Sequence, residues 1–110
     1  MPFDVSQVDT DPVVLALVWA RARIENPKNW TADGHGNYEP GVNFCAVLAI
    51  DSGWKGSADA QDWLSAAAKE LFDMYPLVVN DKLGHAAVMQ VYDKAIETAR
   101  TAALAKASTP

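Results

Sequence analysis

The sequence predicts a compact, mainly α-helical domain of about four helices. Three long segments repeat apolar residues at intervals of three and four, which is the period of an amphipathic helix. A fourth segment, residues 42–51, leaves almost no polar face and is predicted as a buried central helix, with a short buried strand as the alternative. The chain has 110 residues, half of them hydrophobic, which is enough for one domain with one core.

The first helix is expected over residues 12–26. Asp11 followed by Pro12 is typical of an N-cap and first helical position, and Pro27 disfavours helical geometry at Asn26. Its apolar rows are Leu17, Ala20 and Ile24, with Val14, Val18 and Ala22 beside them. The following residues, 27–41, form the longest non-helical stretch. The turn signal Asp33-Gly34 within it predicts a small β-hairpin over residues 30–39, or a long loop.

A third helix is expected over residues 58–75, with Pro76 ending it, and a final helix over residues 85–105. The stripe of the third helix is Ala60, Leu64, Ala67, Leu71 and Met74 or Tyr75; that of the final helix is Val88, Tyr92, Ala95, Ala99 and Ala102. We expect one domain over residues 10–106, a flexible N-terminal tail at residues 1–9, and a frayed end at residues 107–110.

The net charge and the cysteine content of the chain argue against some classes of function. The formal net charge of -5 argues against nucleic-acid binding and against docking on an anionic membrane. The single cysteine, Cys45, cannot form an intrachain disulfide and fits a cytoplasmic protein. The chain carries no apolar run long enough to span a membrane, and no motif for a cofactor.

The polar segment Asn80–His85 is the leading candidate for a binding site. Asn80 and Asp81 can bond turn amides or cap the final helix, Gly84 permits a positive φ, and His85 is one of two histidines. A structural role leads, in which Asp81 or His85 helps to cap the final helix, and binding of a small ligand or anion is the alternative.

Catalysis would require Cys45 and His85 to meet as nucleophile and base, with Asp81 or Asn80 orienting the imidazole. The apolar neighbours of Cys45 favour a buried, inert thiol instead. His35, with Asp33 and Glu39 nearby, lacks the spacing of a metal site, so no metal is predicted.

Four tryptophans are many for this length. Trp19 and Trp63 are expected in the core, and Trp30 is expected to cover a helix end. Trp54, between glycine-containing turns, is the tryptophan most expected to be exposed and is a candidate binding residue at a partner interface, while core packing is the leading interpretation.

Four motifs together resemble a family of small uncharacterised bacterial and phage proteins, a domain of unknown function. They are Ala22-Arg23-Ile24-Glu25-Asn26-Pro27 with Trp30, the apolar Cys45 segment, Asn80-Asp81 with Gly84, and Tyr92-Asp93-Lys94-Ala95-Ile96. Members commonly carry threonine or serine where this chain has His85. The resemblance implies a bacterial or phage protein inside the cell, and it supplies no activity.

From these observations we expect a non-enzymatic intracellular binding or interaction protein. Its partner is an unknown protein or small ligand, and the sequence leaves a homodimer open. The alternative is a small hydrolase or transferase that depends on Cys45 and His85.

Overall fold

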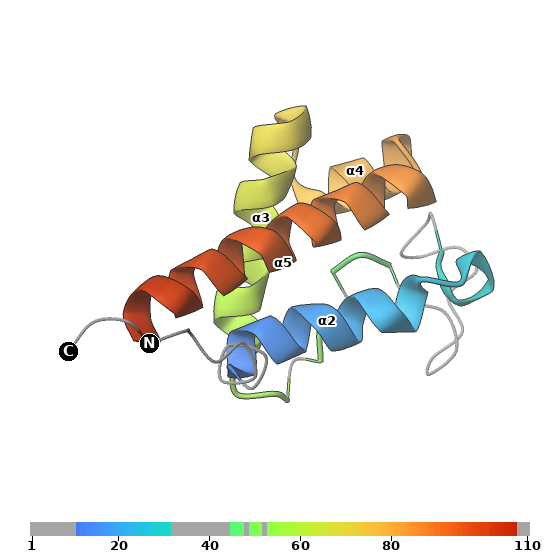
Figure 1. The fold of residues 1–110 in the computed structure, drawn as a ribbon. Coiled ribbons are helices and arrows are strands. Elements are labelled where there is room, and N and C mark those ends of the chain that lie inside the picture. Colours follow the sequence, from blue (N-terminus) through green and yellow to red (C-terminus); the bar gives the residue numbers. More distant parts are fainter. Residues whose placement is uncertain (1–10, 32–44, 48, 52, 108–110) are drawn as a thin grey trace.

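The computed structural model describes residues 11–31, 45–47, 49–51 and 53–107. In these residues the chain forms four α-helices and no β-strand, which confirms the mainly α fold class. The helices are α2 (Pro12–Ile24), α3 (Ser57–Phe72), α4 (Pro76–Lys82) and α5 (His85–Ala107), and a 3-10 helix η1 (Pro27–Asn29) follows α2. Helix α5 contacts the other three, and it crosses in front of α3 in Figure 1.

Helix α2 begins as predicted. The Asp11 carboxylate accepts hydrogen bonds from the amides of Val13, at 2.9 Å, and Val14, at 3.3 Å. These bonds satisfy two amides that have no partner within the helix. Asn26 has an extended backbone (ψ 119°) before Pro27, and the helix ends at Ile24, two residues earlier than expected.

The start of α3 touches the start of α2, and this contact requires glycine. A Cβ atom at Gly56 would stand 2.7 Å from the carbonyl of Pro12. The other end of α3 is closed by Asp73, which adopts a left-handed conformation (φ 55°) and donates its amide to the Lys69 carbonyl. The helix therefore ends at Phe72, three residues before the expected end.

Helix α4 was not predicted as a helix, and its presence corrects our reading of the polar turn. Pro76 occupies the first turn of α4, where its missing amide costs nothing. Asn80 and Asp81 belong to this helix, and the turn is confined to Leu83 and Gly84. Gly84 has a φ of +94° and donates its amide to the Val79 carbonyl at 3.2 Å.

The predicted helix over residues 42–51 is wrong for the part that the structure describes. Residues 45–47 and 49–51 lie in turns and bends, with hydrogen bonds from the Ala49 amide to the Cys45 carbonyl at 3.0 Å and from the Ile50 amide to the Val47 carbonyl at 3.3 Å. The predicted burial is right, because Cys45, Ala46, Ala49 and Ile50 are all buried. The predicted hairpin beyond Thr31 and the predicted tail at residues 1–9 lie outside the described residues.

The core lies where α2, α3 and α5 meet. It contains the predicted positions Leu17, Ala20 and Ile24 of α2, Ala60, Leu64 and Ala67 of α3, and Val88, Tyr92, Ala95 and Ala99 of α5. Leu71 was also expected there, but its side chain is 41 % exposed. Figure 1 gives the reason, because the last turns of α3 project beyond the crossing with α5.

Candidate functional site

A fully buried asparagine occupies the middle of the segment that the sequence singled out. The Oδ1 atom of Asn80 accepts hydrogen bonds from the Trp30 indole, at 2.6 Å, and from the Ala46 amide, at 2.8 Å. Its Nδ2 atom donates to the Thr31 carbonyl, at 2.9 Å, and to the Asp81 carboxylate, at 3.1 Å. We call these five residues the Asn80 network.

The Asn80 network holds two irregular segments against α4. Residues 30–31 and 45–46 come from separate parts of the chain, and both bond to the same amide side chain. An amide offers a separate acceptor oxygen and a donor nitrogen with two hydrogens on one short side chain, which ionised aspartate and leucine do not. Because its acceptor and donor groups are engaged within the chain, Asn80 serves the fold rather than a ligand.

His85 also joins separate elements. Its Nε2 atom lies 2.6 Å from the Ile24 carbonyl, which can only accept, so Nε2 carries the proton and donates. The imidazole packs edge-on against Trp30, with ring centroids 5.5 Å apart. Ile24 is the last residue of α2, so His85 bonds a carbonyl that lacks an intrahelical partner. His85 therefore caps the end of α2, whereas the sequence suggested a cap for its own helix.

Tyr92 completes the anchoring of Ala46. The Tyr92 phenol is fully buried and donates its hydrogen to the Ala46 carbonyl. Burial in apolar surroundings raises the pKa of Tyr92 far above its usual range. Both backbone groups of Ala46 are thus bonded to side chains of other elements, which replaces the hydrogen bonds that a helix would have supplied.

The residues proposed for catalysis take part in the packing and hydrogen bonding of the fold. Cys45 is only 3 % exposed, which confirms the prediction of a buried thiol. The Nε2 atom of His85 faces the Ile24 carbonyl. Asp81 is exposed on α4 and accepts from Asn80, so it does not orient the imidazole.

Trp54 is not the exposed aromatic that the sequence suggested. It is half-buried, and its indole donates to the Pro12 carbonyl at 2.7 Å, so it fastens the loop before α3 to the start of α2. Trp19 packs edge-on against it, with ring centroids 4.8 Å apart, and is itself 45 % exposed. Trp54 therefore has a packing role, and Trp19 was wrongly expected to lie inside the core.

A surface groove in the described part of the chain lies between α2 and α5. Its volume is about 520 Å³, and its walls include Val18, Ile96 and Arg100. Arg21 crosses the groove, bonding Asp93 of α5 at 2.6 Å and Glu25 of its own helix at 3.3 Å. The hydrogen bond to Asp93 raises the pKa of Arg21 above its usual value. Since Arg21 is neutralised by these two carboxylates, it links the helices and attracts little further charge.

A smaller hollow of about 320 Å³ lies on the outer side of α3. We call it the α3 hollow, and it is lined by Ser65, Ala66, Lys69, Asp73, Met74 and Tyr75. Tyr75 is 77 % exposed, the highest value among the large hydrophobic side chains of the described residues. The sequence reading placed Met74 or Tyr75 on the buried stripe of α3. The signal against this was Pro76, which forces Tyr75 into an extended conformation outside the helix (ψ 154°).

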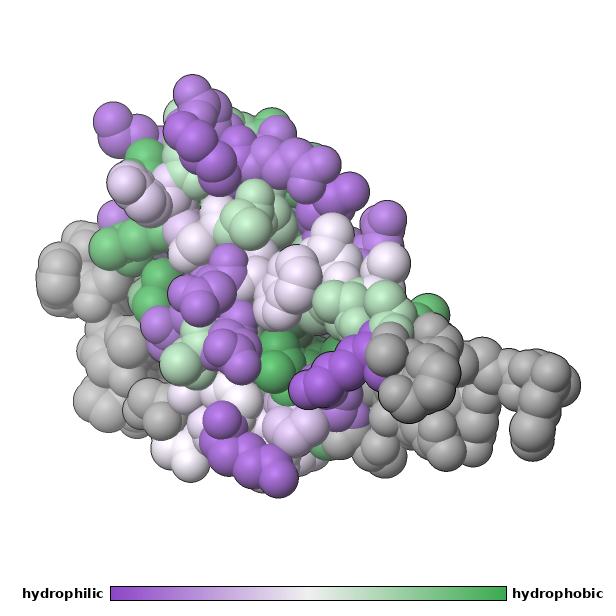
Figure 2. Space-filling view, turned by 90° about the vertical axis from the view of Figure 1, so that its left-hand side faces the viewer, coloured by the Kyte–Doolittle hydropathy of each residue, from purple (hydrophilic) through white to green (hydrophobic). Residues whose placement is uncertain are grey.

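A third hollow of about 130 Å³ lies between the start of α2 and the last turns of α5. Trp63 forms one wall and Lys106 another. Figure 2 views the molecule from this end and shows hydrophobic surface flanked by hydrophilic side chains. The hollow is too small for an ordinary cofactor or drug-sized ligand, which needs at least about 300 Å³.

The described residues contain no group of three histidine, cysteine or acidic side chains able to hold a metal ion. His35, Asp33 and Glu39 lie outside these residues. None of the described helices is long and apolar enough to cross a membrane. Comparison with models of protein families, with curated proteins and with solved structures gave no match for this chain.

Proposed function

We propose that this chain is a non-enzymatic binding protein that acts inside the cell by docking a protein partner. One observation supports this most directly: the polar residues suited to chemistry are used inside the fold, while large apolar side chains remain on its surface. Asn80 and His85 bond backbone groups of other elements, and Cys45 is buried. The exposed large apolar residues are Trp19, Leu71, Tyr75, Leu77, Leu83 and Leu104.

Apolar side chains on a surface favour binding because a partner removes them from water. Burying an exposed leucine or aromatic side chain contributes about 1.5–3 kcal/mol, and aromatic residues are enriched where binding energy concentrates. A bacterial or phage origin, which the resemblance implies, is part of the same proposal.

Site-specific photo-crosslinking tests the proposal. A photoreactive residue is placed in turn at each of the six exposed apolar positions, in bacterial cells that produce the full chain. We expect crosslinks to a discrete protein from at least one position and none from the matched exposed polar position Gln90. Absence of specific crosslinks from all six positions would refute a protein partner.

A thiol assay separates this proposal from the Cys45-dependent enzyme. We expect Cys45 to react with a thiol reagent only after unfolding, because it is 3 % exposed. The Cys45→Ala variant measures background. Rapid reaction of the native protein would instead support the nucleophile.

A further inference from the structure

Negative charge in the described chain is concentrated on α3. This helix and its C-cap carry four carboxylates, Asp59, Asp62, Glu70 and Asp73, and a single cation, Lys69. In contrast, α5 has three cationic side chains and two carboxylates, and α2 with its caps Asp11 and Glu25 has two arginines and two carboxylates. Lys94 of α5 pairs with Glu70 of α3 at 3.7 Å, so the carboxylates of α3 that face away from α5 are those of Asp59, Asp62 and Asp73. A partner that approaches α3 therefore meets a negative potential that the rest of the fold does not share.

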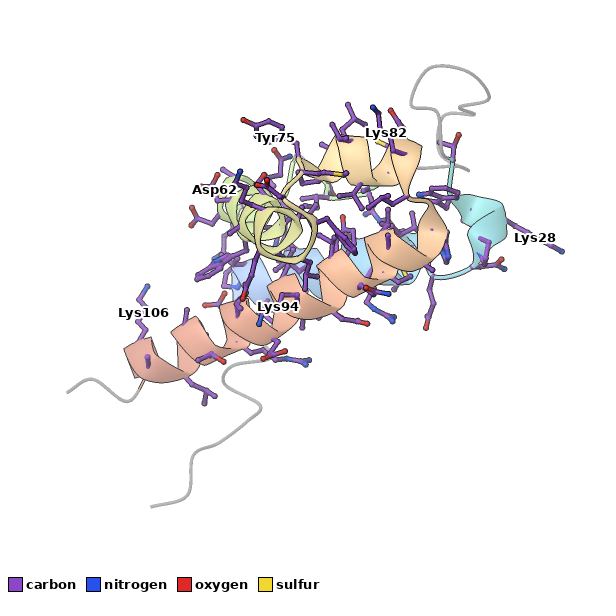
Figure 3. All side chains as sticks on the ribbon, turned by 90° about the horizontal axis from the view of Figure 1, so that it is seen from above. Lys28, Asp62, Tyr75, Lys82, Lys94 and Lys106 are labelled. Carbon is purple, nitrogen blue, oxygen red and sulfur yellow. The ribbon has the colours of Figure 1, made fainter. Side chains whose placement is uncertain are left out.

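Two acidic residues of α3, Asp59 and Asp62, share a face with the α3 hollow. Asp59, Asp62, Ala66 and Lys69 follow one another at intervals of three and four, so they form one stripe, and all four are exposed. Figure 3 shows Asp62 and Tyr75 on the outer side of the molecule, away from α5. The stripe leads toward Asp73 and Tyr75, which line the hollow together with Met74.

The hollow itself combines apolar lining with one ion pair, and the carboxylate of Asp62 lies one helical turn before Ala66 on the same helix. Ala66 and Met74 offer contacts for an apolar side chain, and the exposed Tyr75 ring offers a face to a cation. Lys69 and Asp73 form an ion pair and offset each other, so a basic partner would meet the carboxylate of Asp62 beside the hollow. The C-terminus of α3 lies at the same place and adds a partial negative charge.

We propose that the α3 hollow is the docking site for a basic amphipathic helix of a partner protein. One apolar side chain of that helix enters the hollow, while its arginine or lysine residues meet the Tyr75 ring and Asp62. This assignment rests on the proposed function. It adds a site and a partner chemistry that the exposed apolar residues alone do not define.

The probe for this proposal is a synthetic helical peptide with leucines on one face and arginines on the other. Its matched counterpart has glutamates in place of the arginines. Each is titrated into the isotope-labelled protein and followed by amide chemical shifts. We expect the arginine peptide to shift residues 65–75 and to bind more weakly as salt rises, and the glutamate peptide to bind at least ~10-fold more weakly.

Variants locate the site. Tyr75→Ala should weaken the arginine peptide ~10-fold, the size of a lost cation–π contact together with its buried ring, whereas Tyr75→Phe should retain binding. Leu104→Ala is the matched control, since Leu104 is another exposed apolar residue, near the other end of the molecule. Circular dichroism confirms that each variant folds.

Several outcomes would overturn the docking site: equal affinity for both peptides, equal binding by the Tyr75→Ala and Leu104→Ala variants, or shifts confined to the groove between α2 and α5. Concentration-dependent shifts at the hollow without peptide would identify a second copy of this chain as its occupant. Crosslinking through other apolar positions would leave the proposed function intact while this site failed.

Discussion

The Asn80 network and the α3 hollow depart from the usual distribution of side chains in opposite ways. Asn80 is a polar residue that is 0 % exposed, and Tyr75 is a large aromatic residue that is 77 % exposed. The fold itself accounts for the buried Asn80, because four hydrogen bonds satisfy its side-chain amide. No described residue covers the exposed part of the Tyr75 side chain. A buried polar group with complete hydrogen bonds indicates a structural role, whereas the exposed Tyr75 beside the hollow is the feature on which the proposed docking site rests.

The largest expected effect tests the structural side of this comparison. Asn80→Ala leaves the Ala46 amide, the Thr31 carbonyl and the Trp30 indole without their partner. Each buried group left unsatisfied costs about 1–3 kcal/mol, so we expect a loss of about 3–5 kcal/mol in the free energy of unfolding. Denaturant titration measures it. A loss below about 1 kcal/mol would show that water replaces the amide and that the network is dispensable.

Two leucines of α3, one buried and one exposed, test how burial affects stability within one helix. Leu64 is 0 % exposed, so Leu64→Ala should cost about 2–5 kcal/mol, whereas Leu71 is 41 % exposed and Leu71→Ala should cost less than about 1 kcal/mol. Denaturant titration of the two variants measures both losses in the free energy of unfolding. Equal losses would mean that the last turns of α3 are covered by more of the protein than Figure 1 shows.

Tyr92→Phe removes one hydroxyl and leaves the Ala46 carbonyl without that bond, at a cost of about 1–2 kcal/mol. The free energy of unfolding of Tyr92→Phe should also fall less at alkaline pH than that of the unsubstituted protein. In the unfolded chain Tyr92 ionises near pH 10, whereas burial raises its pKa in the folded protein.

Above about pH 10 the unfolded state therefore binds fewer protons, and stability falls as the pH rises. Below that pH the contribution of Tyr92 is fully present. Unfolding curves of both proteins at neutral and alkaline pH should diverge at neutral pH and converge above about pH 10. A gap that stays constant would show that Tyr92 ionises equally well in both states.

Asp81→Ala should cost only about 0.5–1 kcal/mol. Asp81 is exposed, and the variant removes one of the two bonds from Asn80 Nδ2 while the Thr31 carbonyl keeps the other. Thermal and denaturant unfolding would measure it. A loss as large as that of Asn80→Ala would move the centre of the network to Asp81.

The smallest expected change in stability belongs to Tyr75→Ala. A side chain that is 77 % exposed makes few contacts, so the free energy of unfolding should stay within about 0.5 kcal/mol. Unaltered stability together with lost peptide binding would show that Tyr75 of the α3 hollow serves binding, unlike the Asn80 network, which serves the fold. A marked destabilisation would instead assign Tyr75 to the fold.

Local chemistry was sufficient to predict α2, α3 and α5, because each combines an apolar row of helical period with a start or stop signal, such as Asp11 before α2 and Pro76 after α3. The burial of Cys45 also followed from its apolar neighbours. The notable residues Asn80 and His85 were found from the sequence, but their roles were not. A hydrogen-bond partner such as the Ala46 amide or the Ile24 carbonyl lies 34 or 61 residues away, beyond the reach of any local pattern.

Only the tertiary structure decided which residues form α4, the turns at residues 45–51 and the exposed end of α3. Helix α4 has seven residues, too few to show a period, and its asparagine and aspartate are typical of turns. The apolar segment around Ala46 is held by Asn80 and Tyr92, so bonds from other elements replaced its local helical bonds. Leu71 and Tyr75 remain outside the core. The core covers only the part of α3 near its crossing with α5, so position along the chain, and not hydrophobicity, decides whether these two residues are buried.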